Sequence, residues 1–228
     1  MRPQYRSRCL AFALLGALAG TAAASAPDAP GAIAADGLLS GVPACQTCHG
    51  AQGEGNIPAG FPRLAGAGAG YLAGQLAAFA AGQRQNAVMQ PIAAALTTRQ
   101  QAALARYYAG LGQPASGAAA VEPSPSEAGA WLAARGRWTA DIPACAQCHG
   151  AHGLGIGDAF PPLAGQPAGY LAAQLQSWKH GTRPPGPQSL MAAIAARLSD
   201  DDIAAVADYY ASLPADGAAP AAAVGATR

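Results

Sequence analysis

The sequence has few charged residues and no excess of either sign. Only 11% of its 228 residues are charged, and 13 basic residues face 12 acidic ones. Three of the basic residues, Arg2, Arg6 and Arg8, lie at the extreme N-terminus. A protein that binds nucleic acid needs a basic stripe or face, and the remainder of this chain has none. The composition therefore argues against a nucleic-acid partner and against docking steered by one dominant sign of charge.

Cysteine occurs at five positions, and long apolar runs are almost absent. Four cysteines form two Cys-x-x-Cys pairs, which leaves only Cys9 and hence no spare thiol for a disulfide. Residues 9–20 are apolar, follow the arginines and precede the small residues 22–26, which is the order of a secretory signal peptide. We predict a signal peptide over residues 1–26, cut near Ala24, and export to the bacterial periplasm. An uncleaved signal anchor is the alternative, and no later stretch is apolar enough to anchor the chain in a membrane.

The chain does contain a duplicated Cys-x-x-Cys-His motif, at residues 45–49 and 145–149. Two thiols three positions apart on one helical turn can add to the two vinyl groups of one haem, and the adjacent His can then ligate the iron. The motif therefore predicts two covalently bound haems c. The attachment cysteines are Cys45, Cys48, Cys145 and Cys148, and the proximal iron ligands are His49 and His149. Zinc sites and dithiol redox pairs also use Cys-x-x-Cys and are the alternatives.

A single Met follows each motif about forty residues later. In the first half, after the signal peptide, His49 is the only His, Met89 is the only Met and Lys is absent. Elimination therefore predicts Met89 as the distal iron ligand. The second half contains His152, Lys179 and His180 besides Met191. Alignment of the two halves favours Met191, with His152 or His180 as the alternative, and a Met that merely fills the core is the general alternative for both.

Imidazole and thioether together would fill both axial positions of each iron. Oxygen or peroxide then has no vacant site, and the thioether raises the reduction potential. Such a haem is suited to passing electrons, so we expect an electron carrier and not an enzyme.

The two motifs belong to two copies of one unit. After each motif the sequences Phe-Pro-x-Leu-Ala-Gly, Gly-Tyr-Leu-Ala-x-Gln-Leu and Tyr-Tyr-Ala-x-Leu follow in the same order. We expect one domain over residues 27–112 and a second over residues 127–213. Residues 113–126 between them are rich in Pro, Ala, Ser and Gly, which predicts an extended linker. The Ala-, Pro- and Gly-rich residues 214–228 predict a disordered tail.

Each copy has the pattern of a helical domain. Apolar residues recur at helical spacing within residues 70–81 and 169–180 and in the last segment of each copy. Thr98-x-x-Gln101 and Ser199-x-x-Asp202 resemble capping boxes that would start the last helices. No stretch alternates polar and apolar residues for long. We therefore predict an all-α protein of two tandem domains, each wrapped around one covalent haem.

The predicted domains have little material for a core. Aromatic residues make up only 6% of the chain, and a small domain buries a limited share of its surface. A buried porphyrin can supply the missing apolar centre. We therefore expect each domain to be poorly folded without its haem.

The repeated motifs together resemble cytochrome c4, the dihaem member of the class I cytochromes c, over about residues 36–213. The resemblance implies two cytochrome c domains that face one another about a pseudo-twofold axis. It also implies a haem environment beyond the ligands, in which the carbonyls of Pro62 and Pro161 accept the other ring N–H of the proximal His and Arg84 and Arg183 approach haem propionates. In this chain Gly37 and Gly41 interrupt the segment where the family has its first helix.

Three functions are compatible with these features. The first is a periplasmic carrier that transfers electrons one at a time from a membrane quinol-oxidising complex to a terminal oxidase or reductase. The second is a dihaem electron-transfer subunit of a periplasmic dehydrogenase, such as a sulfide dehydrogenase. The third is a dihaem peroxidase, which would need a displaceable distal ligand. All three imply redox proteins as partners.

Overall fold

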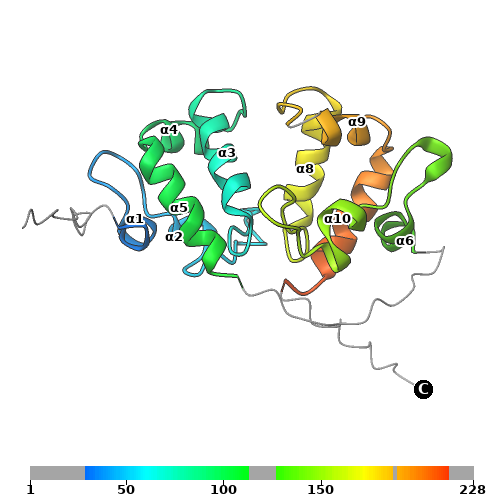
Figure 1. Cartoon of the computed structure of the whole chain (residues 1–228), viewed down its shortest axis with the longest axis horizontal. Coiled ribbons are helices and arrows are strands. Elements are labelled where there is room, and N and C mark those ends of the chain that lie inside the picture. The colour runs from blue at the N-terminus through cyan, green and yellow to red at the C-terminus, as the bar shows by residue number, and fades with distance from the viewer. Residues whose placement is uncertain (1–28, 113–126, 187–188, 216–228) are drawn as a thin grey trace, which may run out of the picture.

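The structure is a computed structural model that describes residues 29–112, 127–186 and 189–215 (Figure 1). The predicted signal peptide, the predicted linker and all but the first two residues of the predicted tail lie outside these ranges. Within them the chain forms helices, turns and four isolated β-bridges, and no longer strand. The predicted all-α class is confirmed. None of the helices in the described part is long and apolar enough to cross a membrane.

The two halves contain the same succession of helices. The first half has α1 (Pro30–Asp36), α2 (Gln46–His49), α3 (Ala69–Ala80), α4 (Met89–Ala94) and α5 (Thr98–Gly110). The second half has α6 (Ala128–Arg135), α7 (Ala146–His149), α8 (Ala168–Lys179), α9 (Leu190–Ala195) and α10 (Asp200–Ser212), together with the short 3₁₀ helices η2 (Trp138–Ala140) and η3 (Ala151–Gly153).

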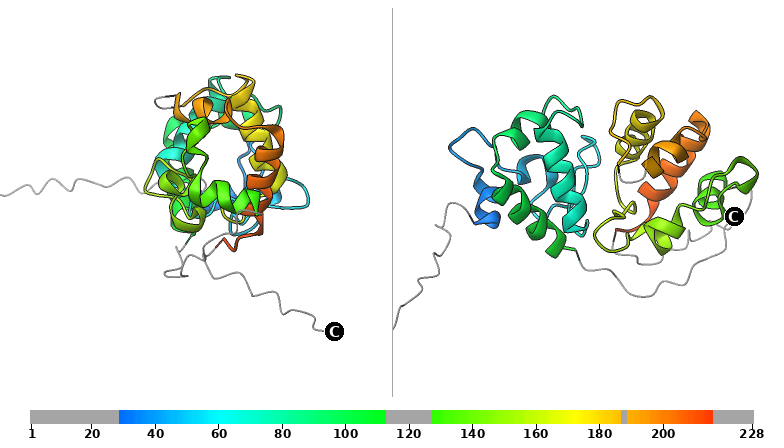
Figure 2. Two further views of the ribbon diagram at one scale, coloured as in Figure 1. Left: turned by 90° about the vertical axis from the view of Figure 1, so that its right-hand side faces the viewer. Right: turned by 45° about the horizontal axis from the view of Figure 1, so that its top comes forward.

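These helices form two domains of the same topology. In the first domain α1 and α3 pack on α5, and α4 packs on α3. In the second domain α6 and α8 pack on α10, and α9 packs on α8. The domains lie side by side with α3 and α8 facing each other at their junction (Figure 1), and along the long axis one domain overlies the other (Figure 2). The duplicated sequence predicts the two domains, and the resemblance to cytochrome c4 implies that they face one another.

Each domain has its own small core. The core of the first domain contains Ile33, Val42, Leu72, Leu96, Leu104 and Tyr108, and that of the second contains Leu132, Ile142, Leu171, Leu198, Ile203, Val206 and Tyr210. In the second domain α6 crosses α10 very closely at Gly129, where an added Cβ would collide with the carbonyl oxygen of Ala205. Helix contact at this point therefore depends on the absence of a side chain.

Both last helices begin with a capping box, and one of the two boxes is at the predicted residues. Ser199 and Asp202 form the expected reciprocal box at the start of α10. In α5 the cap is Thr97, paired with Gln100, so the predicted Thr98–Gln101 box is wrong. The reason is that the Gln101 side chain is buried and donates to the Ala93 and Leu96 carbonyls, which leaves its neighbour to complete the box.

The two helices that were predicted by residue range agree with the structure to within one residue. α3 and α8 each begin and end one residue before the predicted ranges of 70–81 and 169–180. The segment before the first motif does form a helix, α1, and it is only seven residues long. Gly37 ends it with φ 75°, in a close turn where a Cβ would collide with the Val42 carbonyl oxygen.

Candidate haem sites

The two Cys-x-x-Cys-His motifs fold into the short helical turns α2 and α7. In the first, the His49 N–H donates to the Cys45 carbonyl at 3.0 Å, and the equivalent bond in the second measures 2.9 Å. Residues three and four apart in such a turn share one face. Both thiols of each motif are partly exposed, and the His that follows them is only 7% exposed. Each motif therefore presents two thiols and one imidazole on the same side.

The proximal imidazoles are held in one tautomer. Nδ1 of His49 lies 2.8 Å from the Pro62 carbonyl oxygen, and Nδ1 of His149 lies 2.8 Å from that of Pro161. Because a carbonyl can only accept, Nδ1 carries the proton and the Nε2 lone pair remains available to a metal. Burial lowers the pKa of both imidazoles, and the carbonyl hydrogen bond opposes this only in part. Both rings are therefore neutral at pH 7, as an iron ligand must be.

An aromatic ring supports each imidazole from the side. Phe61 lies edge-on to His49 with ring centroids 6.3 Å apart, and Phe160 lies edge-on to His149 at 6.2 Å. Both Phe residues belong to the repeated Phe-Pro-x-Leu-Ala-Gly turn, so the same short segment supplies the ring and the carbonyl. The repeated turn thus supplies both the hydrogen-bond acceptor and the aromatic contact of each proximal His.

The attachment thiols lie beside the tyrosines of the last helices. Burial raises the pKa of Cys45, and it raises the pKa of Cys145 to about 11, so both thiols are protonated at neutral pH. Among the described residues, the buried hydroxyl of Tyr210 has no hydrogen-bond partner stronger than the thiol of Cys145 beside it. A buried polar atom that is so weakly satisfied is costly unless a bound group adds a better partner. The first domain has Tyr108 in the same place, packed so tightly on Gly53 that a Cβ there would approach its ring to 2.7 Å.

The two distal methionines begin equivalent helices. Met89 is the first residue of α4 and Met191 the second residue of α9, and both side chains are half-buried. Ile92 lies one turn beyond Met89 on the same helix face and packs on the cluster that includes Cys45. Ile194 has the same relation to Met191 and to the cluster that includes Cys145. The helix face that carries each Met is therefore directed toward the core of its own domain, against which the first attachment cysteine also packs.

Local hydrogen bonds place the first Met. The Asn86 side-chain oxygen accepts from the backbone N–H groups of Val88 and Met89, at 3.0 and 2.9 Å. The second domain solves the same problem differently, with Ser189 in the left-handed region at φ 54° just before α9. The sequence contains no obvious signal for either arrangement.

Two buried arginines meet where the domains touch. Arg84 donates to Gln75 of its own domain and to Tyr170 and Gln174 of the other, at 2.7 to 3.1 Å. Arg183 makes the mirror set of bonds to Gln174, Tyr71 and Gln75, at 2.9 to 3.2 Å. Each guanidinium also stacks on an aromatic ring, Arg84 over Phe79 at 4.5 Å and Arg183 over Trp178 at 3.9 Å. The pseudo-twofold axis therefore passes through this polar cluster.

The charge of this cluster needs a counter-ion. All of these hydrogen-bond partners are neutral amides and hydroxyls, so two positive charges lie buried near one another. Burial lowers the pKa of Arg183, and the charge of Arg84 lowers it further. A buried charge is strongly disfavoured unless an opposite charge accompanies it. The carboxylates of haem propionates would fit this requirement.

Sequence reasoning missed most of this cluster. It selected Arg84 and Arg183 and overlooked Tyr71, Gln75 and their counterparts Tyr170 and Gln174. The signal was present in the repeated Gly-Tyr-Leu-Ala-x-Gln-Leu motif, because Tyr and Gln four residues apart share one face of a helix. The leucines of the motif belong to the core face of each helix, whereas the polar pair forms the interface between the domains.

The residues present fit a covalently bound haem in each domain. They comprise two thiols and a neutral imidazole on one face of each motif, a weakly satisfied buried hydroxyl in the second domain, and buried cations at the domain junction. The described residues contain no cluster of three or more His, Cys, Asp or Glu that could hold a metal ion. The two cysteine pairs therefore do not converge on the four-cysteine zinc site that was the alternative.

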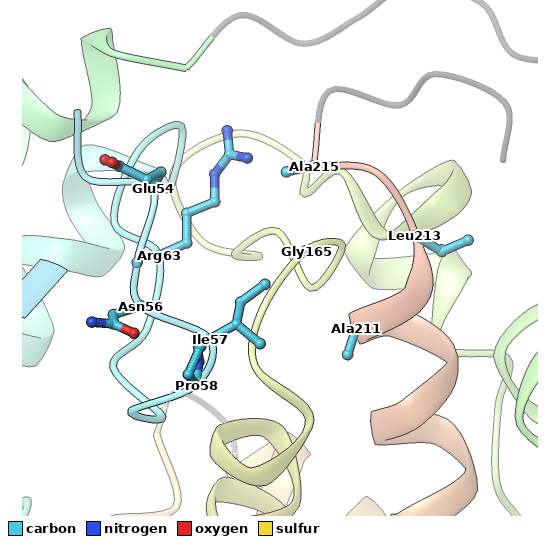
Figure 3. Close-up of a pocket in the computed structure, with 10 residues that line it drawn as sticks. Glu54, Asn56, Ile57, Pro58, Arg63, Gly165, Ala211, Leu213 and Ala215 are labelled. Carbon is cyan, nitrogen blue, oxygen red and sulfur yellow. The ribbon is translucent and has the colours of Figure 1, made fainter. Parts of the chain in front are cut away.

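A cleft of about 530 Å³ also lies at the domain junction, on the side of Arg63 (Figure 3). Glu54, Ile57 and Arg63 line it from the first domain, and Gly165 and Leu213 from the second. None of the predicted iron ligands or attachment cysteines lines this cleft.

Comparison with known proteins agrees with this geometry. The family model described as cytochrome c matches residues 39–111 and again residues 133–214. The chain belongs to the cytochrome c family. With a cysteine pair of the haem-attachment motif in each matched segment, this cytochrome carries two covalently bound haems c and serves electron transfer.

Three relatives of this cytochrome place it more closely. A thiosulfate dehydrogenase electron acceptor from Stutzerimonas stutzeri (strain A1501) is 49% identical over 170 residues, which is 75% of this chain and 79% of the relative. One from Thiomonas intermedia (strain K12) is 46% identical over 213 residues and 91% of both chains. Cytochrome c4 from Pseudomonas aeruginosa is 37% identical over 171 residues, 74% of this chain and 83% of the relative. The cytochrome is thus a dihaem protein of the cytochrome c4 type.

Two solved structures share the fold. The thiosulfate dehydrogenase TsdBA from Marichromatium purpuratum matches with a TM-score of 0.73 and 46% identity over 83% of this chain, which spans 41% of that longer chain. Reduced cytochrome c4 from Pseudomonas stutzeri matches with a TM-score of 0.65 and 31% identity, over 84% of this chain and all of the other. The predicted pair of cytochrome c domains is thereby confirmed.

Proposed function

We propose that this cytochrome accepts electrons from a periplasmic thiosulfate dehydrogenase. The observation that carries the proposal is the higher identity to thiosulfate dehydrogenase electron acceptors, 49% and 46%, than to cytochrome c4, 37%. This is the second of the functions considered from the sequence, with thiosulfate as the dehydrogenase substrate in place of sulfide. The periplasm remains the proposed location because the N-terminal residues have the pattern of a signal peptide.

The proposed axial ligands are His49 and Met89 for the first iron and His149 and Met191 for the second. Support comes from the neutral, buried imidazoles with free Nε2 atoms and from the position of each Met on the inward face of its helix. A bound haem supplies one-electron transfer between Fe(III) and Fe(II). The chain itself orients the imidazoles through the Pro62 and Pro161 carbonyls, and Arg84 and Arg183 would neutralise the propionates at the junction.

Two haems suit the electron count of thiosulfate oxidation. When two thiosulfate ions join through a new S–S bond to give tetrathionate, two electrons are released and no proton. Two ferric haems can take up both electrons, one each, and become ferrous. A dihaem acceptor therefore matches one turnover of such an enzyme, and it needs no proton acceptor of its own.

Two exposed apolar residues mark where electrons would enter or leave. Val88 is 52% exposed and Leu190 36% exposed, and each directly precedes a distal Met. Electron-transfer contacts are small and brief, so one such residue beside each haem edge is enough to form the centre of a docking patch. Substitution by Lys should slow electron transfer without changing the haem spectrum, because neither side chain is an iron ligand. Leu39→Lys is the matched control, since Leu39 is fully exposed in the turn between α1 and α2.

The proposal is tested by reduction of the oxidised protein. Protein matured with both haems is oxidised and mixed with thiosulfate and a catalytic amount of purified thiosulfate dehydrogenase, and haem absorbance is followed. We expect rapid reduction of both haems that requires the enzyme, and slower reduction of Val88→Lys or Leu190→Lys. Failure of the enzyme to reduce the wild-type protein would refute the proposal.

A second candidate is the carrier between a quinol-oxidising complex and a terminal oxidase. The 37% identity to cytochrome c4 over most of both chains favours it. The same absorbance experiment distinguishes the two when membranes containing the quinol-oxidising complex replace the dehydrogenase. Reduction by these membranes alone would favour the carrier.

A further inference from the structure

One peptide group connects the proximal His of the first domain to the second domain. Its carbonyl belongs to Pro62 and accepts from Nδ1 of His49 at 2.8 Å. Its N–H belongs to Arg63 and donates to the side-chain oxygen of Gln166 at 3.0 Å. The side-chain amide of Gln166 donates back to the Arg63 carbonyl at 2.9 Å. A continuous hydrogen-bonded chain thus leads from the imidazole, through a single peptide unit, to a residue of the other domain.

The second domain lacks this connection. Nδ1 of His149 makes the same 2.8 Å bond to the Pro161 carbonyl. The next residue is Pro162, so the equivalent peptide has no N–H to donate. Ala67 of the first domain occupies the position equivalent to Gln166. Its side chain has no oxygen that could accept such a hydrogen bond. Both the donor and the acceptor of the connection are therefore missing around the second proximal His.

Gln166 is well placed to hold this peptide. It is only 6% exposed, and it follows Gly165, which lines the junction cleft together with Arg63 (Figure 3). The bond lies across the domain boundary, so it exists only while the two domains are docked. The two-point contact of the side-chain amide with the Arg63 backbone fixes its orientation.

Hydrogen bonds in series strengthen one another. When a peptide N–H donates, its carbonyl oxygen becomes more negative and accepts more strongly, by roughly 10–30% per bond. A stronger acceptor draws the Nδ1 proton of His49 outward and makes the imidazole a better electron donor to a metal at Nε2. A better donor stabilises Fe(III) relative to Fe(II) and so lowers the reduction potential.

We propose that Gln166 is a positioning residue that lowers the reduction potential of the first haem through the Pro62–Arg63 peptide. The second haem has no equivalent connection to its proximal His, so by this route the docking of the domains acts on the first haem only. This inference rests on the proposed ligation of the first iron by His49. It does not depend on which protein donates the electrons.

The effect is measurable. Strengthening of the His49–Pro62 hydrogen bond by this amount changes the equilibrium constant for reduction of the first haem by up to about twofold. Because a tenfold change corresponds to 59 mV for one electron, this is about 18 mV. Gln166→Met keeps the length of the side chain and removes the amide. We expect it to raise the midpoint potential of the first haem by about this amount and to leave the second unchanged.

Variants at Arg63 provide an independent test. Arg63→Pro removes the peptide N–H and copies the second domain, so it should raise the same potential, and combining it with Gln166→Met should add nothing further. Arg63→Ala keeps the N–H and is the matched control for loss of the side chain. Haem methyl resonances in NMR spectra assign each midpoint to its haem. In reduced protein labelled with ¹⁵N-histidine, the Nδ1 proton of His49 should move upfield in Gln166→Met and that of His149 should not.

The outcomes separate the possible failures. Equal shifts of both midpoints, or no shift of either, would overturn the inference. A changed potential with an unchanged Nδ1 proton of His49 would also overturn it, because domain packing would then be the cause. If His49 is not an iron ligand, the unmodified protein will show this by lacking paramagnetically shifted His49 ring resonances when oxidised. The proposed ligation by His49 is thus tested on the unmodified protein before any variant is made.

Discussion

An ion pair in the second domain allows a prediction to be worked out in full. Arg137 donates two hydrogen bonds to the carboxylate of Asp202, at 2.9 and 2.6 Å, and thereby ties the turn before the second haem-attachment motif to the start of α10. The first domain has Leu38 and Gln100 at the equivalent positions and cannot form this pair. The first domain, which lacks the ion pair, therefore serves as the internal control for its effect on the second domain.

The size of the effect follows from the pKa of Asp202. The hydrogen bonds from Arg137 are the largest cause that lowers this pKa, to about 2 from an ordinary value of 3.8. Such a difference corresponds to at most about 2.4 kcal/mol of the free energy of unfolding. The Arg137 side chain is 48% exposed, so solvent screens the pair. We therefore expect about 1 kcal/mol from it.

The sign is fixed by the direction of the shift. Because the folded-state pKa is lowered, the stabilisation is fully present above about pH 4 and is lost as the pH falls toward 2. Asp202→Asn cannot ionise and lacks it at every pH. Denaturant unfolding of wild type and variant, followed through the second haem's absorbance at several pH values, should show a difference of about 1 kcal/mol at pH 6 that disappears near pH 2.

Two results would refute this reasoning. The difference between wild type and Asp202→Asn could persist unchanged at pH 2, which would mean that loss of the capping box dominates and not loss of the ion pair. The control Arg137→Gln could also leave stability at pH 6 unchanged. Arg137 lies outside the capping box, so its substitution isolates the ion pair.

Three further predictions concern the haems and the core. Met89→Ala should abolish the Fe(III)–thioether absorption band of the first haem only, which halves the band near the red edge of the visible spectrum; retention of the full band would exclude Met89 as ligand. Haem-free protein should show no cooperative melt by circular dichroism, because each core lacks its apolar centre; a native-like melt would contradict this. Gly129→Ala should lower the free energy of unfolding by about 1–3 kcal/mol, since the new Cβ overpacks the contact with Ala205. Gly74→Ala, in open space on α3, should raise it by up to about 1 kcal/mol and is the control.

Local pattern predicted helices well and their ends less well. The helices α3 and α8 were predicted to within one residue because their apolar spacing is long and regular. The start of α5 was predicted one residue late because Thr97 and Thr98 are both competent caps. What decided between them was the buried Gln101 side chain, which bonds to carbonyls at the end of α4 and in the following turn. Only tertiary packing contains that information.

The sequence by itself determined the chemistry of this protein. Haem attachment needs two thiols and an imidazole within five consecutive residues, and the scarcity of other strong ligands in the first half left Met89 as the distal candidate. The duplication then implied two such units. These features are readable because all the groups involved are close in the chain or nearly unique in it.

The tertiary structure decided how the two units act on each other. Arg84 meets Tyr170 and Gln174 across 86 and 90 residues, and Arg63 meets Gln166 across 103 residues. The helical spacing of Tyr and Gln shows that they share one face, but no local pattern shows which distant residues they meet. That depends on which faces the domains bury against each other. The two halves also differ where their sequences match closely. Pro162 has no peptide N–H and Ala67 has no side-chain amide, so the second proximal His lacks a hydrogen-bonded connection that only the docked domains can form.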